Sequence, residues 1–360
     1  GASVGRGFFV LDDYSALREM TPENLSKKGK LFKPRDAKLF RPRSSLGNTG
    51  GQFYVAKNPT YGAVFTYHLK DVPKTSKSKR MQTERKLNSE KKDIPFPGYK
   101  ALSDEMNEKP ASIILTIKDS GGNHIQNVIK VASQGSGRIA WNLRHRSYYP
   151  VRSGSFRGGW GWNPSGPYVT PGDYQAELFL ENNGSIEKLD GPINFSVKPL
   201  REGTLKGSSY DEYNSFRERV SELYINISKY EDVLSMIGDK IQLLAKASTQ
   251  LESFSPDMIA KIADFRKRYN DYEYENDSSP ARDEIGEWYK PNLGARIRIA
   301  MQGLSTSYGP TELNSSNLEI AERHFEKMKN EIEQLNKEVK DLENEVKQLN
   351  PPYIIGQGID

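Results

Sequence analysis

Hydrophobic and polar positions change their spacing along the 360-residue chain, which divides it into regions of different secondary structure. Between about residues 111 and 200, apolar residues alternate with polar ones in short runs separated by Gly, Pro and Asn, which is typical of strands and turns. Between about residues 205 and 350, apolar residues recur every three or four positions, which is the period of amphipathic helices. The pattern therefore predicts a β region followed by an α region.

The alternating region predicts an antiparallel β-sandwich of the immunoglobulin type over residues 111–200. We expect Trp141 to be a buried anchor of this sandwich, because it alternates with the apolar Ile139 and Leu143 along one predicted strand. The strands are expected over residues 112–118, 125–131, 135–143, 174–180 and 193–197.

Two unbroken heptad seams predict long helices over residues 210–247 and 311–349. We expect these helices to pack antiparallel within one chain, because the long connection between them could turn the chain round. A coiled coil between two chains is the alternative. Pro351 and Pro352 are expected to stop the last helix and to leave residues 351–360 as a tail.

The residues before the sandwich are less regular. Residues 7–11 and 62–70 are rich in β-forming side chains and predict strands, with a short helical patch at residues 15–20. Nothing before residues 7–11 supplies a partner strand, so we expect the chain to be the later part of a longer protein. Residues 71–110 are rich in lysine and poor in apolar residues, which predicts a long basic linker or loop.

Charge is unevenly distributed, although the net charge is only +5. Residues 1–110 carry 22 Lys and Arg against 12 Asp and Glu, whereas residues 201–360 carry 21 against 29. The basic stretch at residues 70–109 shows no nucleic-acid-binding motif, and we find no aromatic residues interleaved with its lysines. We therefore expect no nucleic-acid partner, and a solvated segment or one that lies on an acidic neighbour.

The sequence offers little catalytic chemistry. It has no cysteine, and its four histidines are scattered without the spacing of a metal site. Asp12 and Asp13 are adjacent, and neighbouring residues of a strand point to opposite faces. We therefore expect a helix cap and a loop salt bridge from this pair, and not a catalytic pair. We predict no catalytic residue, cofactor or metal in this chain. No stretch is long and apolar enough to span a membrane.

The residues best suited to bind a ligand lie between residues 144 and 168. Aromatic faces stack on sugar rings or on peptide, and arginines add planar hydrogen-bond donors. The alternative is that these aromatic side chains pack against the propeller or under the helical bundle. The candidate binding residues are Arg144, Arg146, Tyr148, Tyr149, Arg152, Phe156, Arg157, Trp160, Trp162 and Tyr168.

Several short motifs occur in an order that resembles one protein family. They are G-R-G-F-F-V-L-D-D-Y-S-A-L-R at residues 5–18, L-F-R-P-R at 39–43, N-P at 58–59 with G-A-V-F-T-Y at 62–67, R-I-A-W-N-L-R at 138–144, and G-P at 166–167 with P-G-D-Y at 171–174. Together they resemble the carboxy-terminal region of bacterial BNR-repeat proteins related to the sortilin ectodomain, which are often labelled glycosyl hydrolases. Ala16 stands where the family usually has Pro, and the Asp-box motif of the repeats does not occur. The middle region also resembles the immunoglobulin-like fold of flagellar hook-capping proteins.

The resemblance implies an exported protein, located in the periplasm, on the outer-membrane surface or outside the cell, with a β-propeller upstream. It implies a non-catalytic scaffold and binding region that contacts protein or glycan at the cell envelope. Two alternatives stay open: the accessory part of a glycoside hydrolase whose active site lies in the propeller, and a coiled-coil assembly module. The expected regions are a propeller-closing β segment (1–70), a basic linker (71–110), the sandwich (111–200), an α-helical bundle (205–350) and the tail (351–360).

Overall fold

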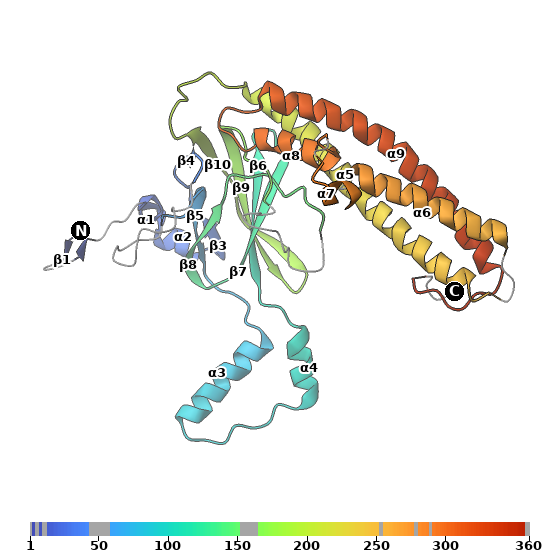
Figure 1. Ribbon diagram of the computed structural model, residues 1–360. Coiled ribbons are helices and arrows are strands. Elements are labelled where there is room, and N and C mark those ends of the chain that lie inside the picture. The colour runs from blue at the N-terminus through green and yellow to red at the C-terminus, as the bar shows by residue number, and fades with distance from the viewer. Residues whose placement is uncertain are drawn as a thin grey trace. The chain divides into compact units, whose positions relative to one another are not determined.

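The computed structural model describes residues 2–3, 7–8, 13–42, 58–151, 165–251, 255–276, 280–287 and 290–356. The chain divides into two compact units, one made of residues 1–146 with 165–204 and the other of residues 147–164 with 205–360. The first unit holds the described strands and the second is helical (Figure 1). The order of β before α is as the sequence predicts.

Two sheets of the first unit enclose one hydrophobic core (Figure 1). Among the described residues, the larger sheet contains, in spatial order, β4 (Ala37–Leu39), β10 (Ser185–Pro199), β9 (Gly172–Asn182), β6 (Ser112–Asp119) and β7 (His124–Val131). The smaller sheet contains β3 (Gly29–Leu31), β5 (Ala63–Leu69) and β8 (Gly135–Trp141). Paired strands are antiparallel except β4 and β10, which run parallel.

Alternation of apolar and polar residues gives the sandwich its core. In β5 every second side chain is buried, and β6 follows the same pattern. The two layers meet through aromatic rings: Phe65 of β5 lies edge-on to Phe195 of β10, with ring centroids 5.1 Å apart. The strands predicted from residues 112 to 197 are all present, and β10 begins earlier than expected.

Trp141 is the buried anchor that its position in an alternating run predicts, with 0% of its surface exposed. Its ring lies 5.3 Å from that of Tyr174 and 6.0 Å from that of Phe195, both in the opposite sheet. The indole Nε1–H donates to the side-chain oxygen of Gln126 at 3.1 Å and to the carbonyl oxygen of Arg144 at 2.9 Å. Trp141 thus joins the two sheets while its one polar group is satisfied.

The sandwich begins earlier in the chain than the sequence analysis predicts. β3, β4 and β5 come from the segment expected to close a propeller, yet β5 pairs with β8 and β4 pairs with β10. The boundaries expected at residues 70 and 110 therefore fall inside one unit. A strand's own pattern shows which face is buried, but it does not show which distant strand is its partner.

The amino-terminal residues also depart from expectation. β2 (Gly7–Phe8) pairs antiparallel with β1 (Ala2–Ser3), so the residues just before it supply the partner that the sequence analysis did not find. Residues 9–11 of the predicted strand lie outside the described residues. The expected helical patch is present as α1 (Ser15–Glu19), and α2 (Pro22–Ser26) follows it.

Residues 71–110 contain two helices, so the loop prediction is wrong. α3 (Ser76–Ser89) begins after Thr75, whose side chain accepts a hydrogen bond from the amide of Ser78 at 3.1 Å. α4 (Tyr99–Asn107) follows a Pro-Gly pair. The Lys, Arg, Glu, Met and Leu residues of α3 favour helix, but so few are apolar that α3 shows no apolar period to recognise.

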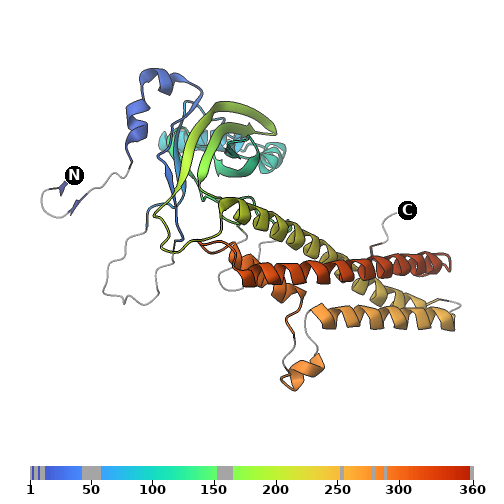
Figure 2. The same ribbon diagram turned by 90° about the horizontal axis from the view of Figure 1, so that it is seen from above.

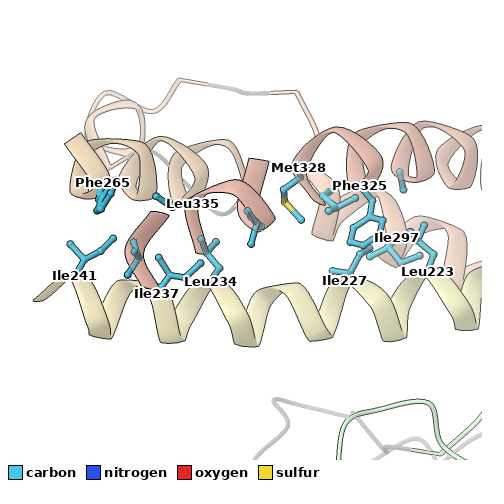
Figure 3. Close-up of a cluster of buried hydrophobic side chains, with 14 of the residues drawn as sticks. Leu223, Ile227, Leu234, Ile237, Ile241, Phe265, Ile297, Phe325, Met328 and Leu335 are labelled. Carbon is cyan, nitrogen blue, oxygen red and sulfur yellow. The ribbon is translucent and has the colours of Figure 1, made fainter. Parts of the chain in front are cut away.

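The second unit is a helical bundle with one continuous core (Figure 3). Its helices are α5 (Tyr210–Ser248), α6 (Pro256–Asn276), α7 (Pro280–Glu284), α8 (Leu293–Gly303) and α9 (Glu312–Lys347). The two long helices lie where the heptad seams predict them. Each begins at a capping box, formed by Ser209 with Glu212 in α5 and by Thr311 with Asn314 in α9.

α5 and α9 run in the same direction, so the predicted antiparallel packing is wrong (Figure 2). Three hydrogen-bonded side-chain pairs join them: Arg219 with Glu322 at 2.8 Å, Tyr230 with Glu333, and Lys240 with Glu343 at 2.6 Å. In each pair the α9 residue follows its α5 partner by 103 residues. A constant separation of this kind occurs only when two helices are parallel.

The helices between α5 and α9 explain this direction. Two ion pairs, Lys261 with Glu345 and Arg268 with Glu338, show that α6 runs antiparallel to α9. α8 also runs antiparallel to α9. Arg296 of α8 donates a hydrogen bond to Asn317 of α9, whereas Ile299, further along α8, accepts one from Asn314, which lies earlier in α9. The two helices in series carry the chain back along the bundle, so α9 starts beside the beginning of α5.

Cysteine cross-linking tests the parallel arrangement, because the chain has no cysteine of its own. With a short bismaleimide, Arg219→Cys paired with Glu322→Cys is expected to cross-link, since the native side chains touch. The control pair, Arg219→Cys with Glu343→Cys, would approach only in antiparallel helices and is expected to remain unlinked. Preferential cross-linking of the control pair, seen by electrophoresis of the monomer, would contradict the parallel arrangement.

Candidate functional site

Arginine and aromatic side chains from four distant segments meet at one end of the sandwich. Phe40 and Arg41 directly follow β4, Tyr61 shortly precedes β5, Arg144 follows β8, and Tyr168 shortly precedes β9. We call these five residues the Tyr168 cluster. All of them belong to the first unit.

Strand pairing brings these four segments together. Ala63 at the start of β5 lies opposite Trp141 at the end of β8. In the larger sheet, Val197 of β10 lies opposite both Gly172, at the start of β9, and Ala37, at the start of the short β4. The cluster is therefore positioned by the ends of rigid strands, which hold side chains more closely than free loops do.

Tyr168 is the centre of the cluster. The guanidinium carbon of Arg144 lies 3.7 Å from the centroid of the Tyr168 ring, and that of Arg41 lies 5.2 Å from it. The ring of Tyr61 approaches Tyr168 edge-on at 6.4 Å, and Phe40 in turn approaches Tyr61 edge-on at 4.9 Å. Two cations next to one aromatic ring form a cation–π arrangement, which fixes their position.

The backbone around the cluster is closely packed, and two glycines make this possible. Gly62 has a φ of +109°, and a Cβ there would lie 1.9 Å from the carbonyl oxygen of Trp141. A Cβ at Gly166 would lie 2.3 Å from the carbonyl oxygens of His145 and Arg146. Arg144 donates from Nη1 to the carbonyl oxygen of Gly166 at 2.9 Å, so the arginine that stacks on Tyr168 is also tied to the backbone.

Two arginines make the cluster electropositive, and Tyr61 stays neutral beside them. Burial, with a further contribution from the neighbouring Tyr168, raises the pKa of Tyr61 to about 12. Tyr61 therefore keeps its hydroxyl proton at physiological pH. Arg41 is exposed, whereas Tyr61, Arg144 and Tyr168 are half-buried. The arrangement offers planar cationic donors beside aromatic faces, which suits an acidic group attached to a flat or apolar body.

The structure brings together only some of the residues chosen from the sequence. Arg144 and Tyr168 face each other, and their backbones also form an isolated β-bridge. Arg146 follows in the same unit, with its amide donating to the carbonyl oxygen of Ile125 and its side chain exposed. The remaining candidates of the 152–164 segment lie outside the described residues: Arg152, Phe156, Arg157, Trp160 and Trp162.

Tyr148 and Tyr149 belong to the helical unit, where they pack on one helix. Their rings stack on each other at 5.2 Å, and each approaches the ring of Tyr224 in α5, at 5.3 and 5.1 Å. Burial, followed by the neighbouring Tyr224, raises the pKa of Tyr149 to about 12. These two residues therefore contact α5 and are not members of the Tyr168 cluster.

Sequence reasoning missed Phe40, Arg41 and Tyr61 as members of the cluster. All three lie in or beside the motifs L-F-R-P-R and N-P-x-x-G that support the family resemblance. The sequence shows only that the second of these motifs adjoins a predicted strand, the one at residues 62–70. Recognising that the ends meet requires the pairing of β5 with β8 and of β4 with β10, which is not encoded locally.

The other candidate groups do not assemble into a reactive site in the described part of the chain. No three His, Cys, Asp or Glu side chains there could hold a metal ion together. Asp13 accepts hydrogen bonds from the amide and the hydroxyl of Ser15 at 2.9 and 2.6 Å, at the start of α1, and Asp12 is not described. None of the described helices has the length and apolar character needed to cross a bilayer.

A shallow depression of about 350 Å³ lies over one end of β9 and β10. Two carboxylates that line it have partners: Asp36 pairs with Lys198 at 2.5 Å, and Asp173 accepts a hydrogen bond from Ser196 at 2.6 Å. The hydrogen bond from Lys198 is the main cause that lowers the pKa of Asp36. This internal pairing makes the depression a weaker candidate than the Tyr168 cluster.

No protein-family model matches the chain, and no curated protein matches it. The resemblance to sortilin-type propeller proteins therefore rests on the order of the motifs. Three of those motifs surround the Tyr168 cluster: residues 39–43, residues 138–144, and the Gly-Pro pair at 166–167.

Replacing Tyr61 with Phe tests the electrostatics of the cluster. Because the pKa of Tyr61 is raised from 10.0 to about 12, folding favours its neutral form. This stabilisation is complete below the unfolded pKa and is lost as pH rises through the folded value. Between pH 10 and 12 the wild type should therefore lose more stability than Tyr61→Phe, as measured by urea midpoints at successive pH values. An identical pH dependence of the two proteins would contradict the assignment.

Proposed function

We propose that this chain is a non-catalytic scaffold and binding region, and that the Tyr168 cluster is its ligand surface. The observation that carries the proposal is the placement of Arg41 and Arg144 around the ring of Tyr168. Strand ends and the hydrogen bond from Arg144 to the Gly166 carbonyl oxygen hold this arrangement before any ligand binds. The entropic cost of ordering these side chains on binding is therefore small.

The chemistry of the cluster favours an acidic glycan as the ligand. Guanidinium groups bind carboxylates through paired N–H donors, and aromatic rings stack on the apolar faces of sugars. A uronic-acid polymer presents a carboxylate on every sugar ring, so it fits both features at once.

The fold of the first unit supports a binding role. Its two sheets share one core. Within it, the hydroxyl of Tyr174 donates a hydrogen bond to the carbonyl oxygen of Thr170 at 2.6 Å. This contact is similar to the tyrosine corner of immunoglobulin-like domains, which commonly act as recognition modules. Together with the motif order, this supports placing the chain in an exported protein of the cell envelope, with a β-propeller upstream as its partner.

The two alternatives receive less support. Apart from the half-buried Tyr230 and the exposed Leu349, the predicted seams of α5 and α9 are buried in the chain's own core, which argues against a coiled coil with a second chain. An accessory role in a glycoside hydrolase would require catalytic carboxylates elsewhere in a longer protein. That reading and the binding proposal are distinguished by assaying glycan hydrolysis with the full-length protein and glycan binding with this chain.

Binding of polygalacturonate, measured by isothermal calorimetry, tests the ligand surface. Arg41→Gln should weaken binding about tenfold or more, because a hydrogen bond to a charged group is lost. The matched control Arg201→Gln removes one exposed positive charge outside the cluster and should have little effect. Equal losses in both variants would indicate non-specific charge attraction. Failure of the wild type to bind any acidic glycan on an array would contradict the proposed ligand class.

A further inference from the structure

α3 and α4 form a helical hairpin that has no buried side chain. They run antiparallel, since Ser76 at the start of α3 bonds Glu108 just after α4, and Arg80 bonds the earlier Glu105. Helices of this length are marginally stable in water unless a face packs against something. The hairpin therefore has more to gain from a partner surface than either long helix of the bundle.

Polar contacts join the two helices. Arg80 donates from Nε and Nη2 to the two carboxylate oxygens of Glu105, both at 2.7 Å, and from Nη1 to Glu84 at 2.6 Å. Leu87 and Leu102 are the half-buried apolar side chains of the two helices. The inner side of the hairpin is thus defined by Arg80, Glu84 and Leu87 in α3, and by Leu102 and Glu105 in α4.

Helical geometry then assigns the outer faces. A residue one position after an inner residue is rotated by about 100°, and in antiparallel helices this rotation leads to the same side of the hairpin. Four residues of that side directly follow an inner residue: Met81 and Arg85 of α3, and Ser103 and Met106 of α4. Lys77 lies one turn before Met81, and Tyr99 lies one turn before Ser103, so both belong to the same side. We call it the Met106 face.

The Met106 face is apolar and basic. Tyr99 and Met106 are 84% and 86% exposed, and Met81 is also exposed. Phe96, which is 65% exposed, lies just before α4 and contacts Tyr99 with ring centroids 5.1 Å apart. Lys77 and Arg85 flank Met81, one turn to either side, and no acidic residue follows an inner residue by one position.

The opposite side of the hairpin differs in charge and polarity. Its residues directly precede the inner ones, and they include Lys79, Thr83 and Lys86 of α3 and Ala101 and Asp104 of α4. It combines both signs of charge and has no large apolar side chain. The hairpin is therefore amphipathic as a pair, although α3 alone shows no apolar stripe.

We propose that the Met106 face binds the surface of an anionic phospholipid bilayer. Phe96, Tyr99 and Met106 enter the interface, and Lys77 and Arg85 contact acidic headgroups. Exposed aromatic and apolar side chains flanked by basic residues are the features of segments that lie in a membrane interface. A fluid lipid surface also needs no complementary pocket, which suits a convex pair of helices.

The observations favour lipid over nucleic acid. Phe96 and Tyr99 lie between lysines, which corrects the expectation of no interleaved aromatics in this segment. Their ring planes are inclined by 70°, however, so they do not form a continuous platform for stacked bases. Methionine side chains contribute little binding free energy to a contact with a polyanion, whereas burial in an apolar interface stabilises them.

Site-specific fluorescence tests the orientation of the hairpin in the full chain. Because the sequence has no cysteine, Met106→Cys can be labelled with the environment-sensitive dye NBD at one site. Thr83→Cys, on the opposite side, is the matched control. Vesicles of equal parts phosphatidylcholine and phosphatidylglycerol should give a blue shift and an intensity increase for the label at 106 and little change at 83. Equal responses, or no response, would overturn the proposal.

Vesicle co-sedimentation measures the contribution of charge. Lys77→Gln combined with Arg85→Gln should weaken binding to the same vesicles about 30-fold, as two basic residues lose their headgroup contacts. The control, Lys79→Gln with Lys86→Gln, removes the same charge from the other side and should have a clearly smaller effect. Equal losses in the two variants, equally strong binding to pure phosphatidylcholine, or retention by RNA or polyglutamate without vesicle binding would each contradict the proposal.

Discussion

The buried indole of Trp141 is the constraint on which the first unit depends. It fills the space between the two sheets, and its single N–H bonds the carbonyl oxygen of Arg144 three residues further on. That hydrogen bond turns the chain as it leaves β8 and sets the position of the arginine that stacks on Tyr168. The Trp141 carbonyl also leaves room only for glycine at position 62, beside Tyr61. The core anchor and the proposed ligand surface are therefore parts of one local structure.

The two units solve different packing problems. In the sandwich, aliphatic and aromatic side chains fill the core and strand ends expose a few polar and aromatic groups, which is an arrangement suited to recognition. In the bundle, two parallel helices are separated in sequence by helices that run the other way, so each long seam is covered by the chain itself. The α3–α4 hairpin differs from both, because the hydrogen bonds of Arg80 join its helices and Met81, Tyr99 and Met106 are left in solvent. The hairpin is therefore better explained as a binding surface, such as the proposed membrane-binding Met106 face, than as part of a hydrophobic core.

The sequence predicted what is encoded locally. Alternation located β5, the strands between residues 112 and 197, and Trp141, and heptad spacing located both long helices, because burial of one face makes apolar residues recur at a fixed period. Non-local features were not predictable in the same way. They are the pairing of β5 with β8 and of β4 with β10, the direction of α9, and the meeting of Phe40, Arg41 and Tyr61 with Arg144 and Tyr168. α3 was missed because its side chains are nearly all polar, so it carries helix propensity without an apolar period. Of the candidate binding residues, Arg144 and Tyr168 were found because arginine and aromatic side chains are informative by type alone, whereas Tyr148 and Tyr149 have that composition but pack on α5.

Native-state hydrogen exchange of Trp141→Ala tests whether this one side chain supports both the sandwich core and the proposed ligand surface. Removing a fully buried indole should lower the free energy of opening by about 3–5 kcal/mol for amides of β6, β8 and β9. Exchange in α9 should be unaffected, and Ile129→Ala, which removes an exposed side chain of β7, should leave the sandwich unchanged. Unchanged protection of the sandwich in Trp141→Ala, with a loss of ligand binding alone, would contradict the account and would make Trp141 a ligand-contacting residue instead of an anchor.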